Sequence, residues 1–476
     1  MGGLLGSLNS SLQALQAFET ALNVSQNNVS NSSTPGYSRQ TVQLEAQPFD
    51  PSQGQDGGVQ AGAVQSTDNS YADQAVRDQL SEQGNYNAQS SALGSIQSLF
   101  DVSGQTGVIG ALNNLFTSFS AWSATPTSTA AQQQVLTSAQ ELAQSFQSTS
   151  ASLSQTTTDL NQQITSTVQQ INSLASQIQQ DNVQIQQSST PNAGLQANLQ
   201  ATLQNLSQLA DTTVTFASNG TATVLLGGQT ALVIGSTQYA IQASFVDPTP
   251  GPNANAVNDA HILDSNGQDI TSQVSQGSLA GLLTVRNTVL PSLQGDGTQT
   301  GSLNQLAQSV ADSVNQILTA AQTPSGGPGI PLFTYNSTSP VDVAQTLAVN
   351  PNITIGTLAP SDPGPPVVSN GAALALSNLG ESTNPTYQIN GQSIVQFAAA
   401  AAAQVGQQAS DAQNGDNLHT TLLTQAQAIQ TQISGVSLDQ EAIQVMELQK
   451  GYEAAGKMVT VIDSLTSTLI NMVSGT

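Results

Sequence analysis

The chain has 476 residues, a length that suits about three domains. Five Lys and Arg residues stand against 29 Asp and Glu residues, a formal net charge of −24, which excludes the cationic surface that nucleic acids and anionic lipids require. Cysteine is absent, so disulfides, thiol catalysis and thiolate metal sites are excluded as well. No apolar run approaches the ~18 residues of a membrane span and no basic residue precedes Arg39, so we expect neither a membrane anchor nor a cleaved signal.

The first 36 residues predict an amphipathic helix that ends abruptly. Its apolar residues recur at three- and four-residue intervals, the spacing of a coiled-coil seam, at Leu8, Leu12, Leu15, Leu22 and Val29. The side chains of Asn28 and Asn31 offer the backbone competing hydrogen bonds, and Pro35 disfavours helical geometry at the residue before it. Pro35 and Gly36 then fit a type II turn, because glycine accepts the positive φ that this turn requires.

The last 39 residues, 438–476, predict a second helix with a matching seam. The apolar positions again alternate by three and four, at Val445, Leu448, Tyr452, Val459, Ile462 and Leu469. A single terminal amphipathic helix more often packs on its own domain. Two seams of similar length at opposite ends of one chain favour the pairing of the two helices with each other.

Helical periodicity dominates the rest of the chain. It runs from Tyr71 to about Phe119, with an expected break at Gly84, and then from Ala130 to Gln187 as one long helix. Between the first seam and this body, Thr41–Glu45 alternates like a short strand and is followed by a loop rich in Pro and Gly. We expect Trp122 to be a core residue.

After Thr212 the apolar period changes to two, which predicts short strands joined by hairpin turns such as Asn219-Gly220. Helical periodicity returns at Leu279, so this β-rich module is inserted between helices. A proline-rich segment follows, and it predicts loops and edge strands.

The sequence therefore predicts a mainly α fold with an inserted β-rich module: a discontinuous terminal coiled coil, a helical bundle domain and an outer β domain. The expected segments are an N-terminal coiled-coil helix (1–36), a connector (37–70), the first part of the helical domain (71–210), the β-rich module (211–276), the second helical part (277–323), an outer module of strands and loops (324–394), the third helical part (395–437) and the C-terminal coiled-coil helix (438–476).

Residues for catalysis are scarce. The two histidines, His261 and His419, lie far apart in the sequence, and no nucleophile elbow, phosphate loop or zinc-binding helix motif is present. Asp264–Asp269 resembles half of a calcium loop but lacks the terminal bidentate acid, so a plain turn is expected. We expect no enzymatic activity and no catalytic, cofactor-binding or metal-binding site.

Two terminal motifs and one internal segment resemble a known family. Asn27–Asn31 with Thr34–Gln40 resembles the N-terminal signature of the bacterial flagellar axial proteins, which comprise rod, hook and hook-associated subunits. Ser434–Ala455 is similar to the C-terminal signature, and its Gly435–Asp439 variant is most similar to the hook-associated subgroup at the hook–filament junction. Gly277–Arg286 resembles the segment by which such chains re-enter their helical domain.

The resemblance implies a structural subunit that joins the hook to the filament and polymerises through its paired terminal helices. The seam residues would then form subunit interfaces. The expected partners are further copies of the chain, the hook subunit, a second hook-associated protein and a flagellar export chaperone, and the expected location is the extracellular flagellum after signal-less export. The implied motif residues are Asn28, Asn31, Pro35, Gly36, Tyr37, Arg39, Gly435, Val436, Leu438 and Asp439.

Three other functions stay open at this point. The chain could be another axial subunit of the hook or distal rod, or a secreted surface adhesin whose β-rich module binds a ligand. A hydrolase of cell-wall glycan would need two carboxylates placed together, and the Asp and Glu residues are scattered. The rare cations Arg39, Arg286, Lys450 and Lys457 could form ion pairs within the chain or fix the register between neighbouring subunits.

Overall fold

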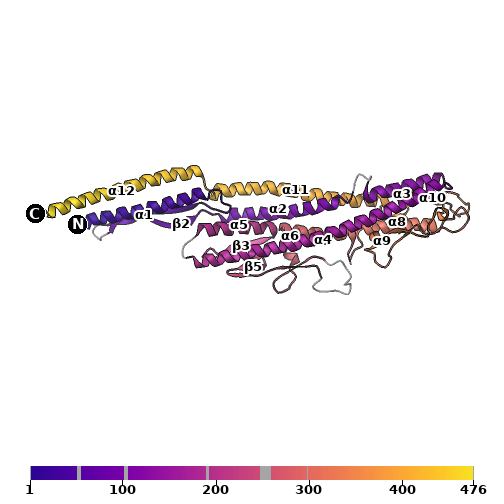
Figure 1. The fold of residues 1–476 in the computed structure, drawn as a ribbon, viewed down its shortest axis with the longest axis horizontal. Helices are drawn as coiled ribbons and strands as arrows, with labels where there is room; N and C mark the ends of the chain where they lie inside the picture. The colour runs from indigo at the N-terminus through magenta and orange to yellow at the C-terminus, as the bar shows by residue number, and fades with distance from the viewer. Residues whose placement is uncertain are drawn as a thin grey trace.

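The molecule is elongated, and both ends of the chain lie at the same tip (Figure 1). The computed structural model describes residues 2–50, 55–100, 106–188, 192–246, 259–296 and 298–474. Helix α1 (Gly2–Ser30) and helix α12 (Leu438–Ser474) run antiparallel beside each other and form a unit that we call the terminal coil. The predicted mainly α fold with a paired terminal coil and an inserted β module is confirmed.

A β-hairpin lies against α1 and joins the terminal coil to the body. Its strands are β1 (Gln40–Asp50) and β2 (Gln55–Ser66), which pair antiparallel from Gln40 opposite Ser66. The prediction of a short strand followed by a loop was wrong, because β1 continues through Pro48. A two-stranded ribbon has only edge strands, and there the missing N–H of proline can face away from the partner strand.

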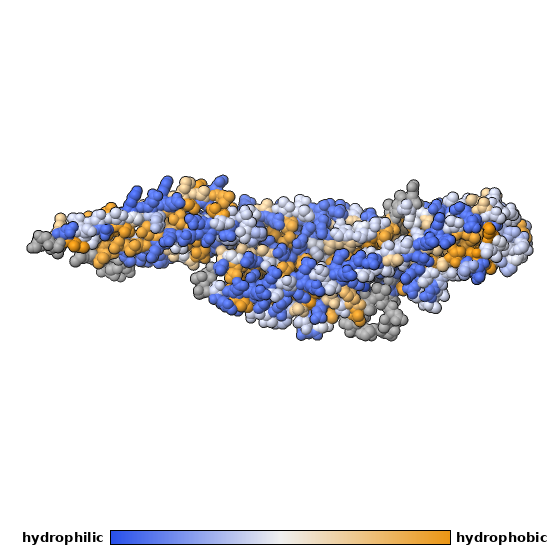
Figure 2. Space-filling view, viewed as in Figure 1, coloured by the Kyte–Doolittle hydropathy of each residue, from blue (hydrophilic) through white to orange (hydrophobic). Residues whose placement is uncertain are grey.

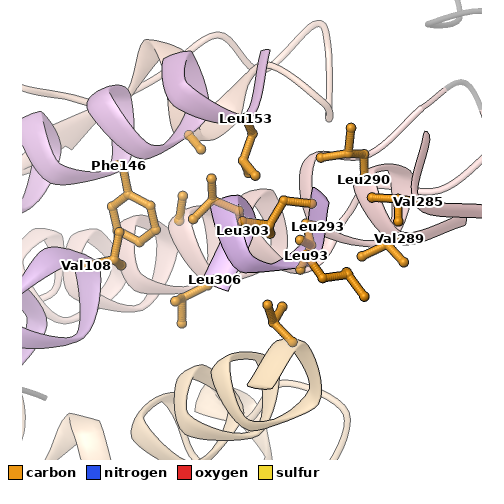
Figure 3. Packing of buried hydrophobic residues seen from close by; sticks show 14 of the residues in the cluster. Leu93, Val108, Phe146, Leu153, Val285, Val289, Leu290, Leu293, Leu303 and Leu306 are labelled. Carbon is orange, nitrogen blue, oxygen red and sulfur yellow. The ribbon is translucent and has the colours of Figure 1, made fainter. Parts of the chain in front are cut away.

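The body is a bundle of helices that run along the long axis (Figure 1). Helix α2 packs along α11, and α4 spans most of the bundle and contacts α3 and α5. Leu93 of α2, Phe146 of α4 and Leu303 of α8 point into one core (Figure 3). The helices are α2 (Ser70–Gln97), α3 (Gly107–Ala124), α4 (Thr129–Gln187), α5 (Ala193–Leu209), α6 (Gly277–Thr284), α7 (Leu290–Gln294), α8 (Ser302–Thr319) and α11 (Ile394–Ser434).

The β-rich module is a four-stranded antiparallel meander on one side of α4, with an extra strand pair. The strands are β3 (Thr212–Phe216), β4 (Ala222–Leu226), β5 (Thr230–Ile234), β6 (Thr237–Gln238), β7 (Gln242–Ser244) and β8 (His261–Leu263). The buried amide of Asn182 fixes the module to α4: its Nδ2 donates to the Ala222 carbonyl at 2.7 Å, and its Oδ1 accepts from the Ala222 N–H at 2.8 Å.

The proline-rich segment 324–394 differs from the strand-bearing outer module that the sequence suggests. In the described chain it holds one pair of two-residue strands, β9 (Phe333–Thr334) and β10 (Ala348–Val349), and two short helices, α9 (Val343–Thr346) and α10 (Gly371–Ser377). These elements pack on α3, α4 and α8 and close the end of the bundle that lies farthest from the termini. Its many prolines withhold backbone donors and so prevent a longer ladder.

Two core expectations have opposite outcomes. Trp122 is fully buried, and its indole N–H donates to the Pro126 carbonyl at 3.1 Å. The expected break at Gly84 was wrong, because α2 continues through this residue. A Cβ at Gly84 would overlap the backbone carbonyl oxygen of Gln208, so glycine serves here for the close approach of α5.

This close approach yields a matched pair of substitutions within α2. We expect Gly84→Ala to destabilise the protein, because the new methyl group would push α5 away. Gly94→Ala should stabilise it by about 0.5–1 kcal/mol, since nothing lies within 4 Å of a Cβ there and alanine favours the helix. Urea unfolding of both variants measures the difference, and equal effects would contradict the packing argument.

Candidate functional site

The two terminal motifs meet where the terminal coil joins the body. Arg39 Nε donates to Glu441 Oε1 at 2.7 Å, and Arg39 Nη2 donates to Gln444 Oε1 at 3.0 Å. The Arg39 backbone N–H donates to the Ser434 carbonyl at 2.8 Å. The Glu441 side chain is 0% exposed and that of Arg39 is 25% exposed, so this ion pair is largely shielded from water. We call the contacts that surround it the motif clamp.

Asn28 forms the second half of the motif clamp. Its buried amide copies a backbone pair, since Nδ2 donates to the Gln40 carbonyl and Oδ1 accepts from the Gln40 N–H, both at 2.8 Å. The Tyr37 hydroxyl also donates to Asn28 Oδ1, at 3.0 Å. Burial raises the pKa of Tyr37, and the negative charge of Glu441 raises it further. The end of α1 is thereby fixed to the start of the hairpin.

Two glycines let backbone segments approach each other closely at the clamp. Gly36 has φ +73°, and a Cβ there would overlap the carbonyl oxygen of Ala197 in α5. The turn after α1 therefore lies directly on the body. Gly435 follows α11, and its Cβ would overlap the carbonyl oxygen of Thr431. Thr67, after the hairpin, donates both its N–H and its hydroxyl to the Arg39 carbonyl.

The structure brings together five of the motif residues that the sequence suggests and leaves others outside. Pro35, Leu438 and Asp439 are exposed, Val436 is half-buried, and the Asn31 amide donates to the Asn27 carbonyl within α1. The motif residues at the clamp are Asn28, Gly36, Tyr37, Arg39 and Gly435.

Sequence reasoning did not select Glu441 and Gln444, which receive the Arg39 side chain. A signal was present, since Arg39 is one of only five Lys and Arg residues and Glu441 closes the C-terminal motif. In the monomer Glu441 Oε2 has no hydrogen-bond partner among the described residues, so the carboxylate depends on Arg39.

The seam residues divide into buried and exposed positions in the single chain. Leu448 and Ile462 are buried, and Leu8, Leu15, Leu22, Val445 and Val459 are half-buried. Four remain exposed by 41–45%: Leu12, Val29, Tyr452 and Leu469. Their role between subunits stays a prediction.

Small residues make the closest contacts in the terminal coil. Helix α1 buries Ala17, Ala21 and Val24, because it is covered by α12 on one side and by the hairpin on another. Gly451 of α12 faces the Phe18 ring, whose nearest atom would lie 2.8 Å from an added Cβ. These residues bring the helices together while several large apolar side chains stay outside.

The terminal coil thus exposes much apolar surface (Figure 2). A groove of about 630 Å³ opens between the start of α1 and the last turns of α12, and its apolar lining includes Leu4, Leu5, Leu8, Val459, Ile462 and Leu469. A contiguous apolar patch of this kind marks an interaction site more often than a free surface.

The remaining polar candidates have ordinary partners. His261 Nδ1 lies 2.8 Å from Asp269 Oδ2, and His419 stacks on Tyr86 with ring centroids 5.2 Å apart. The described residues contain no group of three or more His, Asp or Glu side chains that could hold a metal ion. None of the described helices is long and apolar enough to cross a membrane.

Comparison with known proteins identifies the family. The model of the flagellar hook-associated protein FlgK helical domain matches residues 93–333, just over half of the chain. The chain belongs to the FlgK family of flagellar hook-associated proteins. A second model, the C-terminal region of the flagellar basal body rod FlgEFG proteins, matches residues 425–472 at the end of α11 and in α12.

Two relatives extend the likeness to the whole chain. The chain is 27% identical to flagellar hook-associated protein 1 of Bacillus subtilis (strain 168) over 510 aligned positions, which cover 98% of this chain and 97% of the relative. The flagellar hook junction protein FlgK from Burkholderia pseudomallei has the same fold, with a TM-score of 0.62 and 18% identity over 76% of this chain and 100% of that chain. As a FlgK-family member, the chain is a structural protein of the bacterial flagellum at the hook–filament junction.

The motif clamp can be tested by removing its charges singly and together. We expect Arg39→Met to destabilise the terminal coil by about 2–3 kcal/mol, below the ~3–5 kcal/mol of a fully buried pair because Arg39 is partly exposed. The double variant Arg39→Met/Glu441→Met should recover most of this loss, since it leaves no unpaired carboxylate. Amide exchange of α1 and α12 measures the effect, with exposed Lys450→Met as the control, and additive losses would contradict the clamp.

Tyr37 gives the clamp an alkaline limit. Its pKa is raised in the folded state, so its contribution to stability is complete below the unfolded pKa of ~10 and is lost as the pH rises through the higher folded value. Amide exchange of the terminal coil should therefore accelerate in strongly alkaline solution. Tyr37→Phe should reduce this dependence, whereas Tyr71→Phe, whose ring is 87% exposed, should not.

Proposed function

We propose that this FlgK-family protein joins the hook to the filament by polymerising through its terminal coil. The observation that carries the proposal is the contrast between a firm attachment and an uncovered surface. The motif clamp fixes the coil to the body through a shielded ion pair, while the coil keeps the apolar groove and several large side chains open to water. Apolar burial between copies would supply the driving force.

The body supports this role as the part that keeps copies side by side. Its exposed surface is rich in Gln, Ser and Thr, and only 7% of the residues of the chain are charged, so neighbouring copies repel each other weakly. The coil alone is thin: α1 meets α12 along one face and the hairpin along another. Copies that cover the remaining faces would therefore stabilise the coil in the assembly.

The proposed partners are further copies of the chain, the hook subunit and a second hook-associated protein. We also propose that the chain leaves the cell by the flagellar export route and that a chaperone covers the apolar face of α12 before export. The exposed apolar residues of α12 motivate this step, because such a surface invites aggregation at high concentration.

The other functions considered from the sequence have less support. An adhesin would require a binding surface on the β-rich module, where exposed large apolar residues such as Phe216 and Ile234 are few compared with those of the terminal coil. A hook or distal rod subunit would share the C-terminal match, but the helical domain at residues 93–333 matches the FlgK model.

Deletion of the encoding gene tests the proposed function. We expect cells that retain hooks but carry no attached filaments and release filament subunit into the medium, scored by electron microscopy and by blotting of the supernatant. The full chain should restore filaments. A chain with α1 and α12 intact but with Leu448→Asp and Ile462→Asp, which place carboxylates in the coil, should not. Normal attached filaments in the deletion strain would refute the proposal.

A further inference from the structure

Helix α12 carries a second apolar surface that faces away from the groove. An α-helix turns by about 100° per residue, so Val461 lies about 200° around the axis from Val459, which lines the groove. Along this opposite side runs a row of exposed apolar residues at intervals of three, four or a multiple of them. We call this row the ridge; it comprises Met446, Met458, Val461, Leu465 and Met472, which are 50–67% exposed.

The ridge and the groove also differ in charge. Lys450 and Lys457 are the only lysines of the chain, and each is four residues from a ridge residue, Met446 and Val461 respectively, so both lie on the ridge side. Neither lysine forms an ion pair within the described ranges, and both are exposed. The groove, by contrast, has Asp463 in its lining. An apolar, cationic surface and an apolar, acidic surface therefore occupy opposite sides of one helix.

We infer that the ridge of one copy docks into the groove of the next copy. This inference rests on the proposed function and specifies which faces of the terminal coil meet. The two surfaces are complementary in shape and charge, and every copy carries both, so the contact is heterologous and can repeat around a ring or a helix. Methionine side chains on the ridge can adapt to an irregular apolar lining.

The charges also limit how far adjacent copies are displaced along the axis. Lys457 and Asp463 are six residues apart, which is about 9 Å along a helix that rises by about 1.5 Å per residue. Pairing of Lys457 with Asp463 of the neighbour therefore implies an axial displacement of at most about 9 Å, because the lysine side chain itself spans part of the distance. The terminal coils would lie nearly level around the tube.

Disulfide cross-linking tests the contact directly, because the natural chain has no cysteine. Val461→Cys on the ridge and Leu5→Cys in the groove replace side chains that are 53% and 64% exposed, so the monomer should fold normally. Each variant is expressed as the full chain in the deletion strain, and flagella with attached filaments are isolated and oxidised. We expect the doubly substituted chain to give a ladder of covalent multimers, and a mixture of the two single variants to give dimers.

Matched controls define the outcome that overturns the inference. Val461→Cys paired with Leu374→Cys, which is 48% exposed at the far end of the body, should give no ladder. Dimers formed by Val461→Cys alone would indicate a symmetric ridge-to-ridge contact and would overturn the inference. So would attached filaments in which the double variant remains monomeric after oxidation.

Charge exchange provides a second measurement. Lys457→Asp should reduce the number of cells with attached filaments at least tenfold, and Lys457→Asp/Asp463→Lys should restore part of it. If these variants and the cross-links have no effect while Leu448→Asp/Ile462→Asp abolishes attachment, the ridge and groove do not meet, but polymerisation through the coil stands. If Leu448→Asp/Ile462→Asp also leaves attachment intact, the proposed function fails as well.

Discussion

The ion pair between Arg39 and Glu441 is the contact on which the arrangement of the terminal coil depends. It joins positions 402 residues apart, and together with the backbone bond from Arg39 to Ser434 it fixes α1 and α12 relative to the body. A buried carboxylate is tolerated only where a cation and hydrogen-bond donors compensate for its lost hydration. The pair therefore acts mainly on geometry: only one alignment of the two chain ends satisfies Glu441. This explains why both sequence motifs surround the clamp.

The clamp and the exposed coil represent a division between what one chain completes alone and what it leaves to its neighbours. Polar contacts with strict geometry, such as those of Asn28 and Arg39, are satisfied within the monomer. Apolar contacts, which are non-directional, are left partly unmade on α12. Such a division suits a subunit that must have a defined shape before assembly and a large free energy of association afterwards.

The fold was largely predictable from the sequence where its signals are local. The heptad seams, the long α4 and the hairpin turns of the β-rich module depend on residues within about ten positions of each other, so periodicity and turn chemistry reveal them. The prediction failed where a distant segment decides. Gly84 reads as a helix break until α5 is placed against it, and Pro48 reads as a loop until the hairpin leaves it at an edge. The partner of Arg39 could not be chosen among 29 carboxylates without the closure of the chain.

The placement of the five cations supports the same division between internal fixation and assembly. The three arginines occupy joints between elements: Arg39 at the clamp, Arg77 between α2 and Gln200 of α5, and Arg286 in the π-helical turn Val285–Val289, where its Nε donates to Asn161 of α4 at 2.8 Å. Burial lowers the pKa of Arg77 and Arg286, and nearby Asp73 opposes the shift at Arg77. A planar guanidinium loses less hydration than an ammonium and offers several donors in fixed directions, so arginine suits such joints. Both lysines lie instead on the exposed side of α12. A flexible, strongly hydrated ammonium is poorly suited to fix a joint but can find a carboxylate on an approaching copy, which is the role that their position beside the ridge requires.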